Sequence, residues 1–262
     1  MQSFTEIVTP AMAAEWLAKN TSNRNLNKRL VNDYARDMES GSWVLNGEAV
    51  KIGTDGILLD GQHRLAALVQ ANVAVEMLLV IDLDPKAQDT MDTGRKRSFN
   101  DVLSIKGVAN SASVASVAKR MWAWDNGDVK FSGNIKPTTA ELNAWIAANP
   151  SVHRSAEIGV RTRQAFRVIA QSTAGTTHNL FNRLDESDAA EFFAKLASGA
   201  GLAEGDPILT VRNRLMRDAA DGKRQGDMIK IGLVIKAWNY TRRGESMNRV
   251  EMHNDSIMPI PE

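Results

Sequence analysis

The chain has 262 residues, a formal net charge of +1, and 43% hydrophobic and 24% charged residues. These values are ordinary for a soluble globular protein of one large or two small domains, and they provide no global field that would attract nucleic acid or a membrane surface. Because the chain has no cysteine, disulfides, thiolate zinc sites and cysteine nucleophiles are excluded.

Signals for export and membrane insertion are not expected in this sequence. Residues 1–8 contain no basic stretch followed by an apolar one, so no signal peptide is predicted. No apolar run approaches the roughly 20 residues that a transmembrane helix needs. The four histidines lie far apart, at positions 63, 153, 178 and 253, and do not form a histidine-based metal motif. A cytoplasmic location without a membrane partner is therefore expected.

The first part of the chain alternates helix and strand patterns. Thr9 and Pro10 are typical of a helix start, and an amphipathic helix is predicted over residues 26–39. A hairpin of two strands follows over residues 49–59, because Asp55-Gly56 supplies the positive φ angles of a tight turn. The remaining elements are a helix over 65–70, a strand over 75–81, a short helix from 84 to 91 and a helix capped by Ser98. Together they predict an α+β unit.

After Gly107 the pattern is helical. Helices are predicted over residues 111–125, 138–148, 152–171, 176–184, 187–197 (with its cap and acids beginning at Ser187), 207–221 and 228–240. Residues 126–137 are rich in Gly, Asn and Asp and predict a loop. The predicted fold class is thus α+β, with an α+β domain over 1–107, an all-α domain over 108–247 and an irregular tail over 248–262.

The densest group of unlike polar side chains is Asp60-Gly61-Gln62-His63-Arg64, where a strand ends and a helix begins. The first N–H groups of a helix have no intrahelical partner and favour an anion. Gly61 lets a phosphate approach the backbone, and the three residues after it add side-chain donors. Asp60 could hold a divalent ion or accept a proton. The alternative is that Asp60 caps the helix and Arg64 pairs with a surface acid; the density of polar groups favours the anion site.

A second polar segment, Asp92 to Ser98, combines a glycine with three cations just ahead of a helix start. Its candidate phosphate contacts are Thr93, Gly94, Arg95 and Arg97, and the same segment could contact a nucleic-acid backbone. A solvated basic loop is an equal alternative.

Glu48 stands at the head of the first hairpin strand. If the two strands pair, Glu48 could lie near Asp60, and two acids beside a phosphate suit magnesium binding or general-base chemistry. A solvated loop glutamate is the alternative.

The C-terminal region has a local excess of positive charge, with ten Lys or Arg against five Asp or Glu between residues 206 and 249. Arg212, Arg214 and Arg217 share a helix with apolar residues, and Arg242 and Arg243 follow two aromatic residues. Basic groups near aromatics fit contacts to DNA. An ordinary solvated face beside a core tryptophan is the alternative.

The order of these motifs resembles the ParB/sulfiredoxin-like superfamily, and specifically the ParB-like proteins of bacteriophages and actinobacteria. The resemblance covers residues 5–105 and rests on Gly47-Glu48-Ala49-Val50-Lys51-Ile52, on Leu59-Asp60-Gly61-Gln62-His63-Arg64-Leu65-Ala66-Ala67 and on the strand over 75–81. It implies a small mixed sheet with helices and a pocket for the phosphates of CTP, ATP or ADP. Carried over by position, Gly61, Gln62, His63 and Arg64 would contact phosphate. Glu48, Asp60 and His63 would be the catalytic candidates, with Asp60 beside a magnesium ion.

Members of this superfamily include CTP-hydrolysing DNA clamps, a free-serine kinase and sulfiredoxin, and predicted phage relatives act on modified DNA bases. Sulfiredoxins need a cysteine where Gln62 stands, so that reaction is excluded. Chromosome-partitioning ParB proteins carry a Gly-Glu-Arg-Arg motif that this chain lacks, so a clamp is not predicted.

The resulting hypothesis is an NTP-binding protein that acts on DNA or nucleotides by phosphoryl transfer or NTP hydrolysis, such as a DNA base-modification kinase. Magnesium (Mg2+) and ATP or CTP would be its cofactors, and a nucleotide and DNA its partners. A ParB-like DNA nuclease, which would need clustered acids for two metals, and a non-catalytic DNA-binding or regulatory protein stay open. The oligomeric state is also open, with a homodimer among the options. If the chain is phage-encoded, the cytoplasm would be that of a bacterial host.

Overall fold

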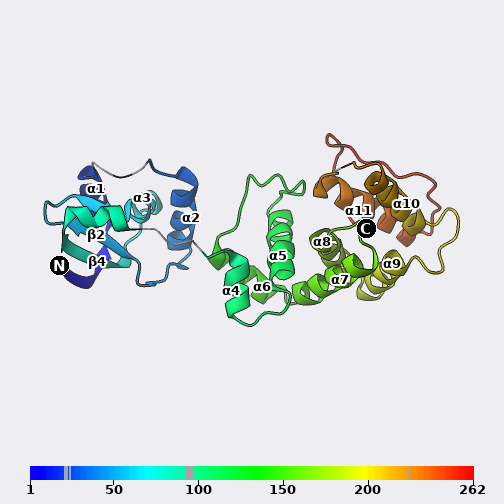
Figure 1. The fold of residues 1–262 in the computed structure, drawn as a ribbon, viewed down its shortest axis with the longest axis horizontal. Helices are drawn as coiled ribbons and strands as arrows, with labels where there is room; N and C mark the ends of the chain where they lie inside the picture. Colours follow the sequence, from blue (N-terminus) through cyan, green and yellow to red (C-terminus); the bar gives the residue numbers. More distant parts are fainter. Residues whose placement is uncertain (21–22, 24, 92–96, 224) are drawn as a thin grey trace. The chain divides into compact units, whose positions relative to one another are not determined.

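The computed structural model describes residues 1–262 except 21–22, 24, 92–96 and 224 (Figure 1). The chain forms two compact units, Met1–Lys96 and Arg97–Glu262. The first unit combines a sheet with helices, and the described residues of the second form helices and irregular segments. The α+β class expected from the sequence is therefore confirmed. Within the described ranges, no helix has the length and apolar character needed to cross a membrane.

The first unit is built on a four-stranded mixed sheet with the order β1-β4-β2-β3. The strands are β1 (Gln2–Val8), β2 (Ala49–Gly53), β3 (Leu58–Asp60) and β4 (Val75–Leu83). Strand β4 runs antiparallel to β1 and parallel to β2, and β2 runs antiparallel to β3. The predicted hairpin and the strand after it are confirmed. Strand β1 was not predicted, because this edge strand is exposed along its length up to Val8 and lacks the pattern of a buried face.

The helices of the first unit are α1 (Pro10–Ala18), α2 (Lys28–Glu39), α3 (Gln62–Ala71) and the 3-10 helix η1 (Pro85–Thr90). Thr9 caps α1 as predicted, since its side chain accepts a hydrogen bond from the amide of Met12 at 3.3 Å. Helix α3 packs against both α1 and α2. Its buried Leu65 and Leu68 join Val50 and Leu79 of the sheet in one hydrophobic core. This core fixes the start of α3 against β2.

The helices of the second unit are α4 (Phe99–Ile105), α5 (Ser111–Asp125), α6 (Thr139–Ala148), α7 (Ser151–Ala165), α8 (Gln171–Asn182), α9 (Glu186–Ser198), α10 (Pro207–Ala220) and α11 (Asp227–Arg243). Ser98 caps α4 as predicted, in a capping box with Asp101. Phe99 and Leu103 of α4 are buried in the core of the second unit. The sequence had placed this helix in the first domain, which it ended at residue 107.

Two helix boundaries and one helix cap in this unit differ from the predictions. The helix predicted over 152–171 ends at Ala165 (α7), and the helix predicted over 176–184 begins earlier, at Gln171 (α8). Phe166 and Ile169 between them are buried, so the apolar spacing continues across the break and hides it from a periodicity argument. Helix α9 is capped by Asp185, which accepts from the amide of Asp188 at 2.8 Å, and not by Ser187.

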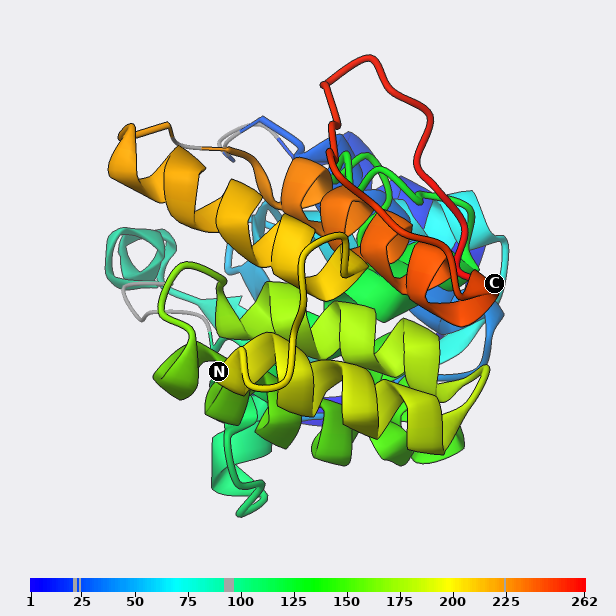
Figure 2. The same cartoon turned by 90° about the vertical axis from the view of Figure 1, so that its right-hand side faces the viewer.

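The irregular tail predicted after residue 247 is confirmed, and it is held against the helices. Met252 and Met258 of the tail are buried in the core. Figure 2 shows the tail in red beside the orange α11, and Lys236 of that helix donates to the carbonyl of Glu251 at 2.7 Å. Glu262 is also held against α11, since the indole of Trp238 donates to its backbone oxygen at 3.0 Å.

Candidate functional site

The candidate site is the corner where β3 meets α3, and we call it the β3–α3 corner. Gly61 makes the turn with a φ of 103°, in the left-handed region. A Cβ atom at this position would lie 3.1 Å from the Cα atom of Val50 on β2. Helix α3 begins at the next residue, Gln62, as the polar motif indicated. Glycine is therefore required both for the turn and for the close approach of two backbones.

Asp60 holds this corner together. Its Oδ1 atom accepts a hydrogen bond from the amide of Gly61 at 2.7 Å. Its Oδ2 atom accepts from Lys51 Nζ at 3.1 Å and lies 3.5 Å from Nη2 of Arg64. Lys51 is paired with Asp60 across the hairpin, and Arg64 is one helical turn further along the chain, so two cations converge on one carboxylate.

The three side chains of this cluster are partly exposed, at 27% for Lys51, 17% for Asp60 and 13% for Arg64. They carry two positive charges and one negative charge. The Nη1 atom of Arg64 is buried and has no hydrogen-bond partner in the part of the chain that the structure describes. Since a buried guanidinium nitrogen without a partner is unfavourable, the cluster is suited to accept an anion.

Gln62 and His63, which the sequence assigned to phosphate binding, are buried and in contact with the segment between α1 and α2. Oε1 of Gln62 accepts from Asn20 Nδ2 at 2.9 Å, and Nε2 of His63 accepts from the amide of Asn27 at 3.0 Å. The contact requires an unprotonated Nε2 atom, so a neutral His63 carries its proton on Nδ1. Their roles as phosphate donors and, for His63, in catalysis stay predictions.

Three amide side chains that the sequence did not single out complete the corner. Nδ2 of Asn23 donates to the carbonyl of Leu58 and to Asn20 Oδ1, both at 2.6 Å. Nε2 of Gln88 donates to the carbonyl of Leu59 and to Asn23 Oδ1, both at 3.1 Å. These contacts satisfy backbone carbonyls of the edge strand β3. The clustering of Asn20, Asn23 and Asn25 was the sequence signal, because asparagine side chains often bind local backbone.

Glu48 is exposed just before β2, and its amide donates to Asn46 Oδ1 at 3.0 Å. Among the described residues, no hydrogen bond or ion pair joins Glu48 to Asp60, and no group of three or more His, Asp or Glu side chains could hold a metal ion. Thr93, Gly94 and Arg95 lie outside the described residues. Arg97 is exposed and begins the second unit. The catalytic and metal-binding roles of Glu48 and Asp60 stay predictions.

Four of the five cations that the sequence assigned to DNA make internal contacts. Arg212 donates to the carbonyls of Leu196 and Ala197 and lies 4.2 Å from the ring centroid of Phe166; burial lowers its pKa. Arg214 pairs with Asp218, Arg242 with Asp188, and Arg243 with both Glu245 and Glu262. Arg217 is exposed, and its side chain has no partner within the described ranges. Only Arg217 is thus uncommitted among these five.

No family model, curated protein or solved structure matches the chain. What the β3–α3 corner does must therefore be argued from its own residues.

Proposed function

We propose that the first unit binds the phosphate groups of a nucleoside triphosphate at the β3–α3 corner, as a ParB/sulfiredoxin-like domain. The protein would use ATP or CTP to act on DNA or on a nucleotide, by phosphoryl transfer or by hydrolysis. One observation carries this proposal: Lys51 and Arg64 converge on Asp60 at the N-terminus of α3, and Arg64 keeps a buried nitrogen without a described partner.

Each part of the corner has a chemical reason to face phosphate. Gly61, in the left-handed conformation, immediately precedes α3. The helix dipole and the first amides of α3 favour an anion at this end of the helix. Lys51 is the most exposed of the three charged groups and can turn from Asp60 to a phosphate oxygen. Arg64 can add two parallel hydrogen bonds to one phosphate. The excess of one positive charge would be neutralised by the ligand.

Magnesium fits this corner only in part. Asp60 is the carboxylate nearest to the phosphate donors, and both of its oxygens already face cations or an amide. Proteins bind magnesium through one or two carboxylates plus the phosphates of the substrate. We therefore propose that the triphosphate supplies most of the ligands of any magnesium ion, and that Asp60 would have to leave Lys51 to add one.

Glu48 is the proposed base that would accept a proton from the attacking hydroxyl. Its carboxylate is exposed beside β2, whose Lys51 pairs with Asp60. An exposed carboxylate is free to meet a substrate, whereas His63 is committed to Asn27. This assignment separates binding, by Lys51 and Arg64, from chemistry, by Glu48.

A thermal-shift titration with ATP, CTP, GTP and ADP in the presence of magnesium tests the binding step. A nucleotide at a hundred times its Kd should stabilise the protein by about 2.7 kcal/mol. The ligand-induced shift should be lost in Arg64→Ala and reduced in Lys51→Ala. Lys28→Ala, which removes an exposed lysine of α2 in the same unit, is the matched control and should keep the shift. A chain that no nucleotide stabilises would refute the proposal.

Phosphate release in the presence of DNA or of free nucleosides tests the chemistry separately. We expect Glu48→Gln to keep the thermal shift and to lose turnover. If the wild-type protein binds a nucleotide but turns none over with any acceptor, the nucleotide is a regulatory ligand and the phosphoryl-transfer part is wrong.

A further inference from the structure

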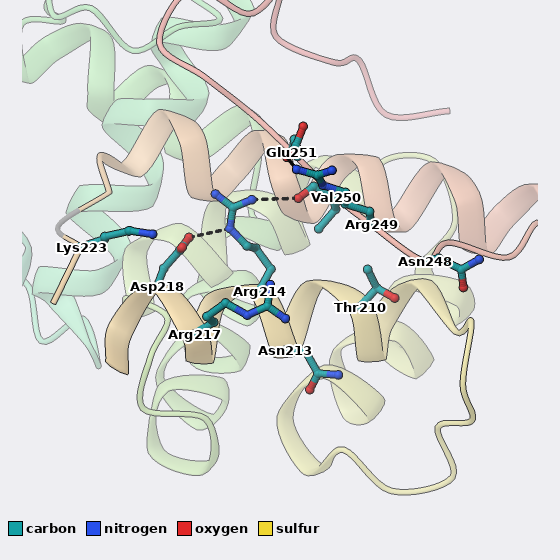
Figure 3. A pocket seen from close by; sticks show the side chains of 10 residues that line it. All are labelled: Thr210, Asn213, Arg214, Arg217, Asp218, Lys223, Asn248, Arg249, Val250 and Glu251. Carbon is teal, nitrogen blue, oxygen red and sulfur yellow. Dashed lines mark hydrogen bonds and ion pairs between the residues drawn. The ribbon is translucent and has the colours of Figure 1, made fainter. Parts of the chain in front are cut away.

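The second unit contains a polar groove between α10 and the first residues of the C-terminal tail (Figure 3). Its volume is about 360 Å³, and of the ten residues that line it only Val250 is apolar. Pockets for drug-like small molecules are lined mainly by apolar and aromatic side chains. The lining of this groove is therefore better suited to a charged, hydrated ligand than to an apolar one.

Positive charge dominates the lining. Arg214 and Arg217 come from α10, Lys223 follows that helix, and Arg249 comes from the tail, against two acids, Asp218 and Glu251. Asp218 is buried, with 5% of its side chain exposed. It is neutralised by Arg214 Nε at 2.9 Å and also accepts from Gln225 Nε2 at 3.1 Å, so it presents little negative charge to a ligand.

Several donors of the groove remain for a ligand. Arg214 uses Nε for Asp218 and Nη1 for the carbonyl of Val250 at 3.1 Å, as the dashed lines in Figure 3 show. A guanidinium has five N–H donors, so these contacts orient Arg214 without exhausting it. Arg217 is exposed and has no side-chain partner in the described part of the chain.

Within the described residues, the other two cations of the groove are held by exposed ion pairs. Arg249 pairs with Glu251, and Lys223 pairs with Asp221 at 3.2 Å. Exposed pairs of this kind contribute about 0–1 kcal/mol, so a phosphate can replace either acid at low cost.

The groove is long enough to hold more than one phosphate. From Thr210 to Arg217 along α10, a rise of 1.5 Å per residue gives roughly 10 Å. Phosphates of one nucleic-acid strand follow each other at about 3.4 Å along the duplex axis. The groove wall is therefore long enough for consecutive phosphates of one strand.

We infer that this groove binds the phosphodiester backbone of a nucleic acid, with Arg217 and Arg249 as the main contacts and Arg214 as a fixed donor between them. Such contacts position a strand without reading its bases. The inference concerns a different unit from the β3–α3 corner and holds whether or not that corner binds a nucleotide.

The test is fluorescence anisotropy of the full chain with short labelled single-stranded and duplex DNA of mixed sequence, over a range of KCl concentrations and without added nucleotide. Affinity should fall as salt rises, because cations are released from the bound phosphates. Arg217→Ala should reduce the slope of log K against log salt by about one, and the double variant Arg217→Ala/Arg249→Ala by about two. Arg163→Ala removes an exposed arginine of α7 that does not line the groove, and it should leave the slope unchanged.

Three results would overturn the inference. The first is no binding of either DNA. The second is an equal loss of slope in Arg163→Ala and Arg217→Ala, which would reflect net charge alone. The third is a poly-glutamate peptide that binds as tightly as DNA with the same dependence on Arg217, which would identify an acidic protein segment as the ligand. The DNA-binding measurement uses no nucleotide. If nucleotides fail to stabilise the protein in the thermal-shift test, the test of DNA binding by the groove is therefore unaffected.

Discussion

Two regions of the molecule bury polar side chains around a histidine, and they differ in access. At the β3–α3 corner, buried Gln62 and His63 lie beside partly exposed Lys51 and Arg64. At the crossing of α7 and α8, Ser155, His178 and Asn179 are 0%, 1% and 0% exposed. Charged side chains beside the buried polar groups are partly exposed in the first region, whereas the polar groups of the second are closed off from solvent.

The crossing of α7 and α8 contains a serine–histidine pair that resembles a catalytic pair but is buried in the core. Oγ of Ser155 lies 3.0 Å from Nδ1 of His178, a pairing typical of a nucleophile and its base. The helices close over this pair, because Gly159 and Gly175 allow their backbones to meet. Burial, together with the charge of Arg154, lowers the pKa of His178 to about 4. His178 thus serves as a neutral core residue.

The largest effect on stability should come from adding a side chain where α7 and α8 cross. A Cβ atom at Gly159 would lie 2.9 Å from the amide nitrogen of Gly175 and would also meet the carbonyl of Gln171. Gly159→Ala should lower the free energy of unfolding of the second unit by about 3 kcal/mol, the upper end for overpacking. Urea unfolding followed by helical circular dichroism measures it. Gly226→Ala, where a Cβ meets nothing within 4 Å, is the control, and equal stability of the two variants would contradict the close crossing.

The buried histidine should make stability depend on pH. The folded-state pKa of about 4 is below the ordinary value of 6.5, so the unfolded chain binds a proton first as pH falls. Stability should drop by about 3 kcal/mol between pH 6.5 and pH 4 from this group, at 1.36 kcal/mol per pKa unit. Urea unfolding across this range should show the drop, and His178→Gln should remove it. The exposed His153 provides the control: a loss of the drop in His153→Gln would mean that His178 is not its source.

At the β3–α3 corner, removing one amide should have an intermediate effect. Asn23→Ala leaves the carbonyl of Leu58 without its side-chain donor and should cost about 1–3 kcal/mol, the penalty of an unsatisfied buried group. Hydrogen exchange should also become faster at β3. Asn25→Ala changes an exposed asparagine of the same segment and should have no such effect. Equal exchange rates in both variants would show that Asn23 does not order the strand.

The smallest change is expected at Glu48. This side chain is exposed, and substitution of such residues usually alters stability by less than about 0.5 kcal/mol. Calorimetric unfolding of Glu48→Gln should therefore match the wild-type protein. A loss of more than 1 kcal/mol, on the order of a lost hydrogen bond, would assign Glu48 to holding the corner rather than to chemistry.

Local signals in the sequence determined much of this fold. The cap at Thr9, the Asp55-Gly56 hairpin turn, the capping residue Ser98 and helix α5 were all predictable, because their hydrogen bonds and turn angles involve residues a few positions apart. The polar motif from Asp60 to Arg64 was likewise visible as a strand end followed by a helix start.

Only the tertiary structure decided which polar residues meet. Strand β1 is identified by its pairing with β4, which places Gln2 opposite Ile81, because the side chains of β1 before Val8 are exposed. The sequence did not pair Asn20 with Gln62 or Lys51 with Asp60, and it could not tell the buried His178 from the exposed His153. Such contacts depend on how distant segments pack, because burial and hydrogen bonding belong to the folded surroundings and not to the residue type. The motif at the β3–α3 corner was therefore visible in the sequence, and its Asp60, Lys51 and Arg64 cluster appeared only in the fold.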